Sequence, residues 1–115
     1  MWLPISALFG ATAVVCGAFG AHALKSRLAA EQLASWSTAV HYHLLHSVVL
    51  LVVVLYSSQA SKSATLPASL FSAGIVMFSG SIYLLVLTKQ TWLGPVTPIG
   101  GLLLIGGWLS LWTLR

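Results

Sequence analysis

The sequence predicts an all-α protein, an integral membrane bundle of four transmembrane helices. Only 5% of its 115 residues are charged, whereas soluble domains carry about 25%. Its apolar residues, 58% of the chain, gather in four runs, each long enough to cross a hydrocarbon core of roughly 30 Å as a helix. The runs are apolar on every face, which argues against barrel strands, because those alternate in character. We expect a single domain over residues 1–115, with the lipid bilayer around it.

The first apolar run, residues 3–24, contains no charged side chain. Ala21-His22-Ala23 is typical of a signal-peptide cleavage site, but no Lys or Arg precedes the run, so we predict a transmembrane helix. The following segment is the most polar stretch of the chain and contains Glu31. Its apolar residues are spaced as in an amphipathic helix, which predicts a short interfacial helix over about 26–37.

The second and third helices are predicted at about 38–56 and 67–87. They are separated by a serine-rich loop containing Lys62, which a hydrocarbon core would not tolerate. The third helix begins with Pro67 in its first turn, where the missing N–H costs nothing.

The fourth helix is predicted at about 97–114, after a polar turn over 88–95. Thr97 is expected to cap this helix, and Pro98 to occupy its first turn. Small residues predict close helix packing. They recur every four residues in the first helix and are adjacent in the fourth: Ala13, Gly17 and Ala21, and Gly106 and Gly107.

Four crossings place both termini on one side of the membrane, called side A, together with the 57–66 loop. The 25–37 and 88–97 connections lie on the opposite side, side B. Basic residues number three on side B and two on side A: Lys25, Arg27 and Lys89 against Lys62 and Arg115. This count favours side B as cytoplasmic. The basic residues form no cluster with aromatic residues, so no nucleic-acid partner is expected.

Polar side chains that could carry a function are predicted to converge at one depth, in the side-B half of the bundle. His43 and His46 share one face of the second helix, because they are three residues apart. Polar groups inside a bilayer must find partners within the protein. The candidate layer consists of His22, Tyr42, His43, His46, Ser79, Tyr83, Gly100 and Gly101.

Three interpretations of this layer stay open. The side chains could hydrogen-bond one another and hold the bundle together. They could bind a ligand: haem, a metal ion or a quinone, with His22, His43 and His46 as the metal ligands if any. They could also line a proton or small-solute path in an oligomer. No cofactor is predicted outright, and no catalytic residue is visible, because Glu31 is the only carboxylate.

Four motifs, in order along nearly the whole chain, resemble the YgdD/YwdK-type family of small four-helix membrane proteins of unknown function, the domain of unknown function 423, which has mitochondrial relatives. They are GAFGAHAL (17–24), WSTAVHYHLLH (36–46), FSGSIY (78–83) and TPIGG (97–101). The resemblance implies a multi-pass protein of the bacterial inner membrane and no activity. It marks these motif positions: His22, Tyr42, His43, His46, Ser79, Gly80, Tyr83, Thr97, Pro98, Gly100 and Gly101.

The leading hypothesis is a non-enzymatic membrane protein. It would act as a scaffold or accessory subunit, or bind a small ligand at the polar layer near one membrane face. A homo-oligomer or a larger membrane complex is the expected assembly.

Overall fold

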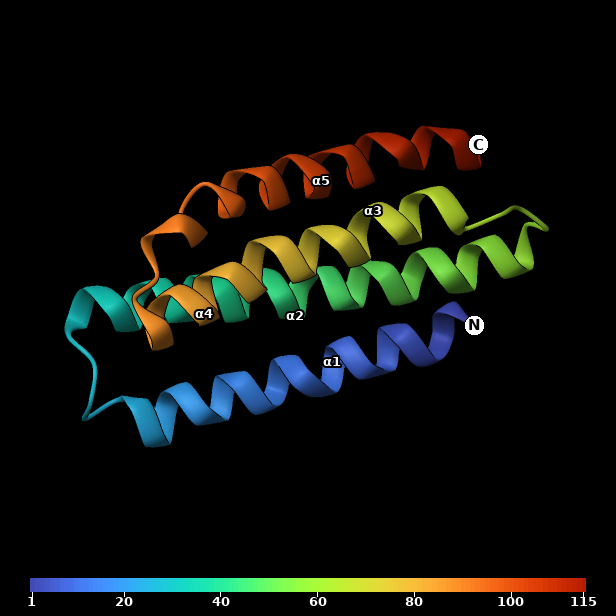
Figure 1. The fold of residues 1–115 in the computed structure, drawn as a ribbon. Coiled ribbons are helices and arrows are strands. Elements are labelled where there is room, and N and C mark those ends of the chain that lie inside the picture. The colour runs from blue at the N-terminus through green and yellow to red at the C-terminus, as the bar shows by residue number, and fades with distance from the viewer.

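The computed structural model describes all 115 residues and confirms an all-helical fold with four membrane-length spans (Figure 1). The spans are Trp2–Leu24, Ala30–Gln59, Thr65–Thr88 and Thr91–Leu114. Their elements are α1 (Trp2–Phe19) with the π turn η1 (Gly20–Leu24), α2 (Ala30–Gln59), α3 (Thr65–Ile75), the π turn η2 (Val76–Gly80), α4 (Ser81–Thr88), the short 3₁₀ turn η3 (Thr91–Leu93), α5 (Val96–Ser110) and the 3₁₀ turn η4 (Leu111–Leu114).

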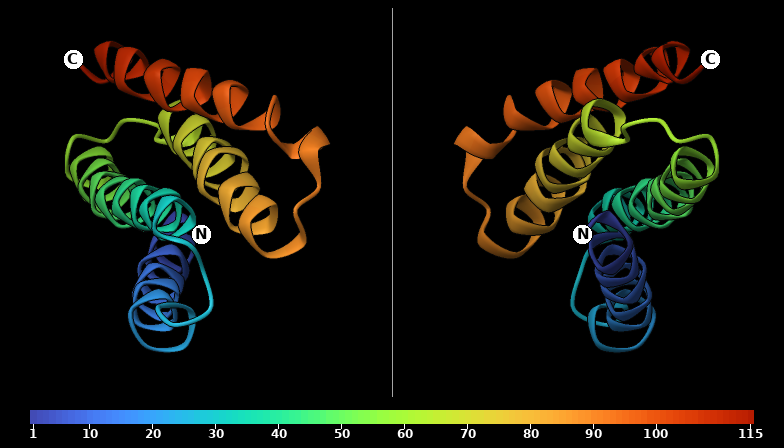
Figure 2. Two further views of the ribbon diagram at one scale, coloured as in Figure 1. Left: turned by 90° about the vertical axis from the view of Figure 1, so that its left-hand side faces the viewer. Right: turned by 90° about the vertical axis from the view of Figure 1, so that its right-hand side faces the viewer.

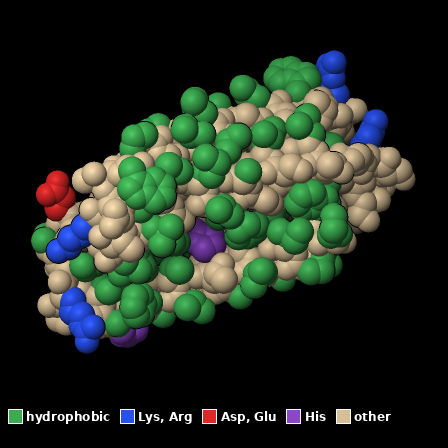
Figure 3. All heavy atoms as spheres, viewed as in Figure 1, with side chains coloured by type: hydrophobic (Ala, Val, Ile, Leu, Met, Phe, Trp, Pro, Cys, Tyr) green, Lys and Arg blue, Asp and Glu red, His purple; other side chains and the backbone are tan.

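Both termini lie at one end of the molecule, beside the turn between α2 and α3 (Figure 1). The α1–α2 connection and the segment between α4 and α5 lie at the other end. This is the arrangement expected for four crossings. Figure 3 shows hydrophobic side chains over the middle of the visible face and charged side chains at its two ends. An apolar middle between charged ends is the surface that a bilayer requires.

The prediction of a separate interfacial helix over 26–37 is wrong. Residues 30–37 are the first turns of α2, which runs unbroken from Ala30 to Gln59. No glycine or proline occurs within that range, so nothing interrupts the backbone hydrogen bonds where the chain leaves the interface. One long helix therefore replaces the predicted pair.

The predicted cap at Thr97 is also wrong. α5 begins at Val96, and its N-cap residue is Pro95. The Thr97 hydroxyl instead pairs with the hydroxyl of Ser81 in α4. Within the bundle, this contact satisfies the side chain as well as a cap would, and it ties two helices together. Pro98 does lie in the first turn of its helix, as predicted.

The helices are arranged as an open row rather than a closed bundle (Figure 2). α1 packs on α2, α2 on the α3–α4 helix, and that helix on α5. The main apolar core lies between α2, α3 and the C-terminal span, and contains Val53, Phe71, Ile75, Leu104 and Leu114. A smaller core at the side-B end contains Leu24, Trp36 and Val86. Because α1 has a single neighbour, a lateral groove remains between it and the α3–α4 helix.

Small residues allow the closest approaches between helices. A methyl group on Gly100 would lie 2.2 Å from the backbone nitrogen of Phe78, and one on Gly107 would lie 2.8 Å from the Phe71 ring. Ala13 is buried, and a methyl group on Gly17 would lie 3.3 Å from Val40. Gly106, by contrast, leaves 3.9 Å to Leu70, which is ordinary contact.

The predicted packing role of Ala21 is wrong, because this residue is exposed. The π turn Gly20–Leu24 widens the helix and changes which residues face α2. Gly20 takes the contact instead, and a methyl group there would lie 2.5 Å from the Trp36 ring.

Candidate functional site

His43 is the centre of a hydrogen-bonded set of side chains from three helices. Its side chain is buried, and its Nε2 atom lies 3.1 Å from the Thr12 hydroxyl of α1. Its Nδ1 atom lies 3.0 Å from the Tyr83 hydroxyl of α4. Ser47, one turn along α2, donates to the His43 carbonyl over 2.6 Å. Every polar atom of the His43 ring therefore has a partner inside the protein.

Two arrangements of hydrogen atoms satisfy this set. In the first, Tyr83 donates to Nδ1 of His43, Nε2–H donates to Thr12, and Thr12 donates to the carbonyls of Leu8 and Phe9, which lie at 2.9 and 3.0 Å. In the second, Thr12 donates to Nε2 and Nδ1–H donates to Tyr83, so the phenol proton of Tyr83 is free. A neutral imidazole exists in either form. These side chains can thus offer a bound ligand either a hydrogen-bond acceptor or a hydrogen-bond donor.

These side chains line the lateral groove between α1 and the α3–α4 helix. The groove encloses about 260 Å³ and is mostly apolar. Its lining residues are Phe9, Thr12, Cys16, His43, Ile75, Val76, Ser79, Gly80 and Tyr83. The groove is called the His43 groove below.

The π turn η2 forms one wall of the His43 groove. Ser79 is buried in this turn and donates to the Ala39 carbonyl of α2 over 2.7 Å. Gly80 lines the groove, and a methyl group on it would meet nothing within 4 Å. Single π turns within α-helices occur frequently at functional sites. Here the Ser79 hydrogen bond attaches the π turn to α2, and Gly80 leaves open space in the groove.

His46 belongs to a second polar group, which joins α2 to α5. Its Nδ1 atom lies 2.8 Å from the Tyr42 carbonyl, and its Nε2 atom accepts from the indole N–H of Trp108 over 3.1 Å. A carbonyl only accepts and an indole N–H only donates. His46 is therefore a neutral imidazole with its proton on Nδ1. Phe71 packs against the ring, at 5.9 Å between centroids.

The layer predicted for the side-B half extends to the middle of the bundle. Thr12, the partner of His43, lies halfway along the span Trp2–Leu24. His43 itself lies about 20 Å from the beginning of α2, at 1.5 Å per residue. Figure 3 shows a histidine side chain midway along the long axis, among hydrophobic ones. The polar groups reach the middle of the bundle because α2 begins eight residues earlier than predicted.

The remaining predicted residues lie outside both groups. His22 is exposed and has no hydrogen bond within the protein. Tyr42 is 40% exposed and contributes only its carbonyl and its ring, which stacks on His46. Gly100 leaves no ligand space, because the backbone of η2 fills it, and Gly101 makes ordinary contact with the Phe78 ring. The glycine pair is a packing feature.

The structure does not assemble the histidines into a metal site. No group of three or more His, Cys, Asp or Glu side chains is arranged to hold a metal ion. His43 and His46 have different partners, and His22 is not among them. The set His22, His43 and His46 therefore does not converge within one chain.

Sequence reasoning missed Thr12 and Trp108. Thr12 is a hydroxyl residue in the middle of an otherwise apolar run, a position where a polar side chain needs a partner in the bundle. Trp108 lies well inside its span, away from the interface where tryptophan is usually found. Both departures were visible in the sequence, but their partners depend on helix packing.

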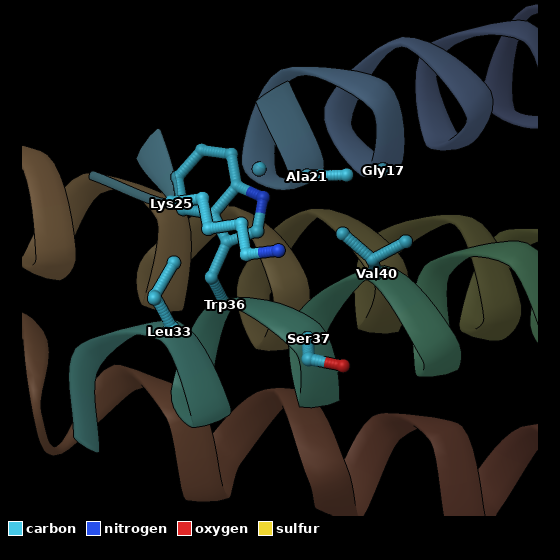
Figure 4. A pocket seen from close by; sticks show the side chains of 8 residues that line it. Gly17, Ala21, Lys25, Leu33, Trp36, Ser37 and Val40 are labelled. Carbon is cyan, nitrogen blue, oxygen red and sulfur yellow. The ribbon is translucent and has the colours of Figure 1, made fainter. Parts of the chain in front are cut away.

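A further hollow of about 370 Å³ lies between α1 and α2 near side B (Figure 4). Lys25, Ser37 and Val40 line it, as does the exposed Ala21. Trp36 is buried at its edge and donates its indole N–H to the Cys16 carbonyl over 2.9 Å. The tryptophan thus joins α2 to α1.

Comparison with known proteins shows relatives over nearly the whole chain. The family model described as protein of unknown function (DUF423) matches residues 16–101. A UPF0382 membrane protein of Staphylococcus aureus is 40% identical over 111 residues, which are 96% of this chain and 91% of that protein. The UPF0382 membrane protein YwdK of Bacillus subtilis is 38% identical, covering 96% and 92%. A UPF0382 membrane protein of Haemophilus influenzae is 38% identical, covering 96% and 89%. No solved structure matches the chain.

Proposed function

Because this chain belongs to the DUF423 family, whose relatives are named only as membrane proteins, we propose its function from its geometry: it binds a small lipophilic molecule in the His43 groove, without catalysing a reaction. The observation that carries the proposal is the groove itself. It is a lateral opening about 260 Å³ in volume, with apolar walls and three polar side chains from different helices. Ligand sites commonly combine an apolar lining with a few convergent polar groups.

The hydrogen bonds of His43 indicate the chemistry of the ligand. A carbonyl on the ligand would accept the phenol proton of Tyr83, which is free when Nδ1–H of His43 donates to Tyr83. A hydroxyl on the ligand would instead donate to Tyr83 or Thr12 in the other arrangement. We therefore propose a lipophilic carbonyl or hydroxyl compound, of which a quinone is one class.

Haem or a metal ion fits this site less well than a neutral ligand. An imidazole ligates a metal through a free nitrogen lone pair. The Nε2 lone pair of His46 is already used by Trp108, and both ring nitrogens of His43 are hydrogen-bonded. Binding a metal would cost these bonds.

A non-enzymatic role is supported by the lining of the groove. Its polar groups are Thr12, Cys16, His43, Ser79 and Tyr83, with no carboxylate that could orient or charge the imidazole. Glu31 lies in the first turn of α2, at the end of the molecule.

A proton path along His43 is disfavoured. In one direction, the hydrogen-bonded chain ends at the carbonyls of Leu8 and Phe9, after Thr12. These carbonyls cannot pass a proton onward, and Ser6, the next polar side chain of α1 toward side A, donates to the Leu3 carbonyl instead. A scaffold or accessory role remains the alternative. Its support is the open row of helices, which leaves large apolar side chains of α1 and α5 exposed.

The experiment is purification in a mild detergent, followed by mass spectrometry of the small molecules that accompany the protein. We expect one lipophilic carbonyl or hydroxyl compound at near-equal molar amount. Tyr83→Phe and Thr12→Val should lower its retention about tenfold, since each removes a hydrogen-bonding hydroxyl from the groove. Trp108→Phe, outside the groove, is the control and should retain it. Protein isolated only in one larger complex, with no such compound, would favour the accessory role.

A further inference from the structure

A second opening lies at the side-B end, between α2, α4 and the beginning of α5. It encloses about 690 Å³ and shares no lining residue with the His43 groove. Its lining residues are Glu31, Gln32, Ser35, Thr38, Ile82, Leu85, Val86, Lys89, Gly94, Thr97 and Pro98. It is called the side-B pocket here.

The side-B pocket contains two opposite charges that do not meet. Glu31 is the only acidic residue of the chain, and Lys89 is one of five basic ones. Both line the pocket, and the structure contains no ion pair between them. In such an apolar protein, two unpaired charges on one pocket indicate an occupant that carries both signs.

Lys89 ends α4, as its C-cap residue with a φ of 59° in the left-handed region. Its side chain therefore lies at the side-B end of α4, where it lines the pocket.

The other lining residues divide into polar and apolar sides. The hydroxyl proton of Thr38 is used by the Ala34 carbonyl, so its oxygen can accept a further bond two turns along α2 from Glu31. Ser35 has no hydrogen bond within the protein and can donate. Ile82, Leu85 and Val86 form an apolar side along α4. The pocket thus joins a charged region at the interface to an apolar surface that leads into the bilayer.

We propose that the side-B pocket binds a phospholipid whose headgroup carries a primary ammonium. The phosphate would pair with Lys89, and the ammonium would donate to Glu31. The acyl chains would follow Ile82, Leu85 and Val86. A zwitterionic headgroup satisfies both charges at once, whereas an anionic headgroup would leave Glu31 unpaired and repel it. A quaternary ammonium has no N–H to donate and should bind less well.

The test is native mass spectrometry of the full-length protein in mild detergent. Phosphatidylethanolamine, phosphatidylcholine and phosphatidylglycerol with identical acyl chains are added in turn. We expect phosphatidylethanolamine to bind about fivefold more tightly than either of the others, the effect of one partly exposed charged contact. Glu31→Gln should abolish the preference for phosphatidylethanolamine over phosphatidylcholine. Lys89→Gln should weaken the binding of all three lipids. Lys62→Gln, at the opposite end, is the matched control and should change nothing.

Several outcomes would overturn the proposal. Equal binding of phosphatidylethanolamine and phosphatidylcholine would show that the ammonium is not recognised. Tightest binding of phosphatidylglycerol would assign the pocket to anionic lipids. Soluble phosphoethanolamine that competes as well as the lipid does would contradict the role of the acyl chains. A preference that survives Glu31→Gln, in a variant with unchanged thermal unfolding, would remove the carboxylate from the site.

Discussion

The indole N–H of Trp108 donates to Nε2 of His46 over 3.1 Å, and this bond determines which form of the imidazole is present. Nδ1 of the same ring lies 2.8 Å from the Tyr42 carbonyl and must carry the proton. His46 is thus a structural residue that joins α2 to α5. His43, three residues earlier, has hydroxyl partners on both sides and can change its form. The two histidines share a helix but differ in what they can do.

His46→Leu is expected to lower the free energy of unfolding in detergent by about 1–3 kcal/mol, because it removes the acceptor of the Trp108 N–H within the membrane span. Thermal unfolding followed by circular dichroism measures the change. His41→Leu is the matched control, since His41 is exposed, and its stability should hold or rise. Equal losses in the two variants would mean that the Trp108 bond contributes nothing.

Gly100→Ala is expected to destabilise the protein by about 1–3 kcal/mol, because the added methyl group would lie 2.2 Å from the backbone of Phe78 and force α5 away from η2. Gly101→Ala has 3.8 Å of room and should be neutral or slightly stabilising. Thermal unfolding of the two variants provides the comparison. If both behaved alike, the close approach of these helices would be wrong.

Nitrogen-15 NMR of histidine-labelled protein should distinguish the two imidazoles. His46 is expected to show a single form with its proton on Nδ1. In Tyr83→Phe, His43 should carry its proton on Nε2, because Thr12 is then its only partner. A His46 signal with the proton on Nε2 would be inconsistent with the Trp108 bond.

Sidedness is tested by labelling single cysteines in intact cells, in a Cys16→Ser background. The basic residues favour side B as cytoplasmic, so Lys89→Cys should react only after the cells are opened. Lys62→Cys should react from outside. The reverse pattern would place side A in the cytoplasm.

The four spans could be predicted from the sequence because hydropathy depends on composition alone. The boundary between the interfacial segment and α2 could not, since nothing in the local sequence marks whether a helix continues through the interface. The π turn Gly20–Leu24 was not predictable either, and it moved the packing contact from Ala21 to Gly20.

The sequence predicted which residue types form the site better than it predicted which side chains bond to one another. Counting residues from the helix ends predicted that His43 and Tyr83 lie at one depth, and in the structure they are hydrogen-bonded. The same counting grouped His22 and His46 with them, because equal depth does not say which face of a helix meets which neighbour. Thr12 became a partner only through the packing of α1 on α2.

The central claim is that the His43 groove holds a lipophilic ligand, and a variant that fills the groove tests it most directly. Gly80→Leu adds a side chain where nothing lies within 4 Å, on a backbone with an ordinary helical φ of −60°. Gly10→Leu is the matched control: a methyl group there also meets nothing within 4 Å, and Gly10 does not line the groove.

The measurement is the amount of lipophilic compound that accompanies each variant through purification in mild detergent, with thermal unfolding recorded in parallel. We predict that Gly80→Leu unfolds at the same temperature as the unmodified protein and loses the compound, while Gly10→Leu keeps it. Equal retention by a stable Gly80→Leu variant would contradict binding in the groove.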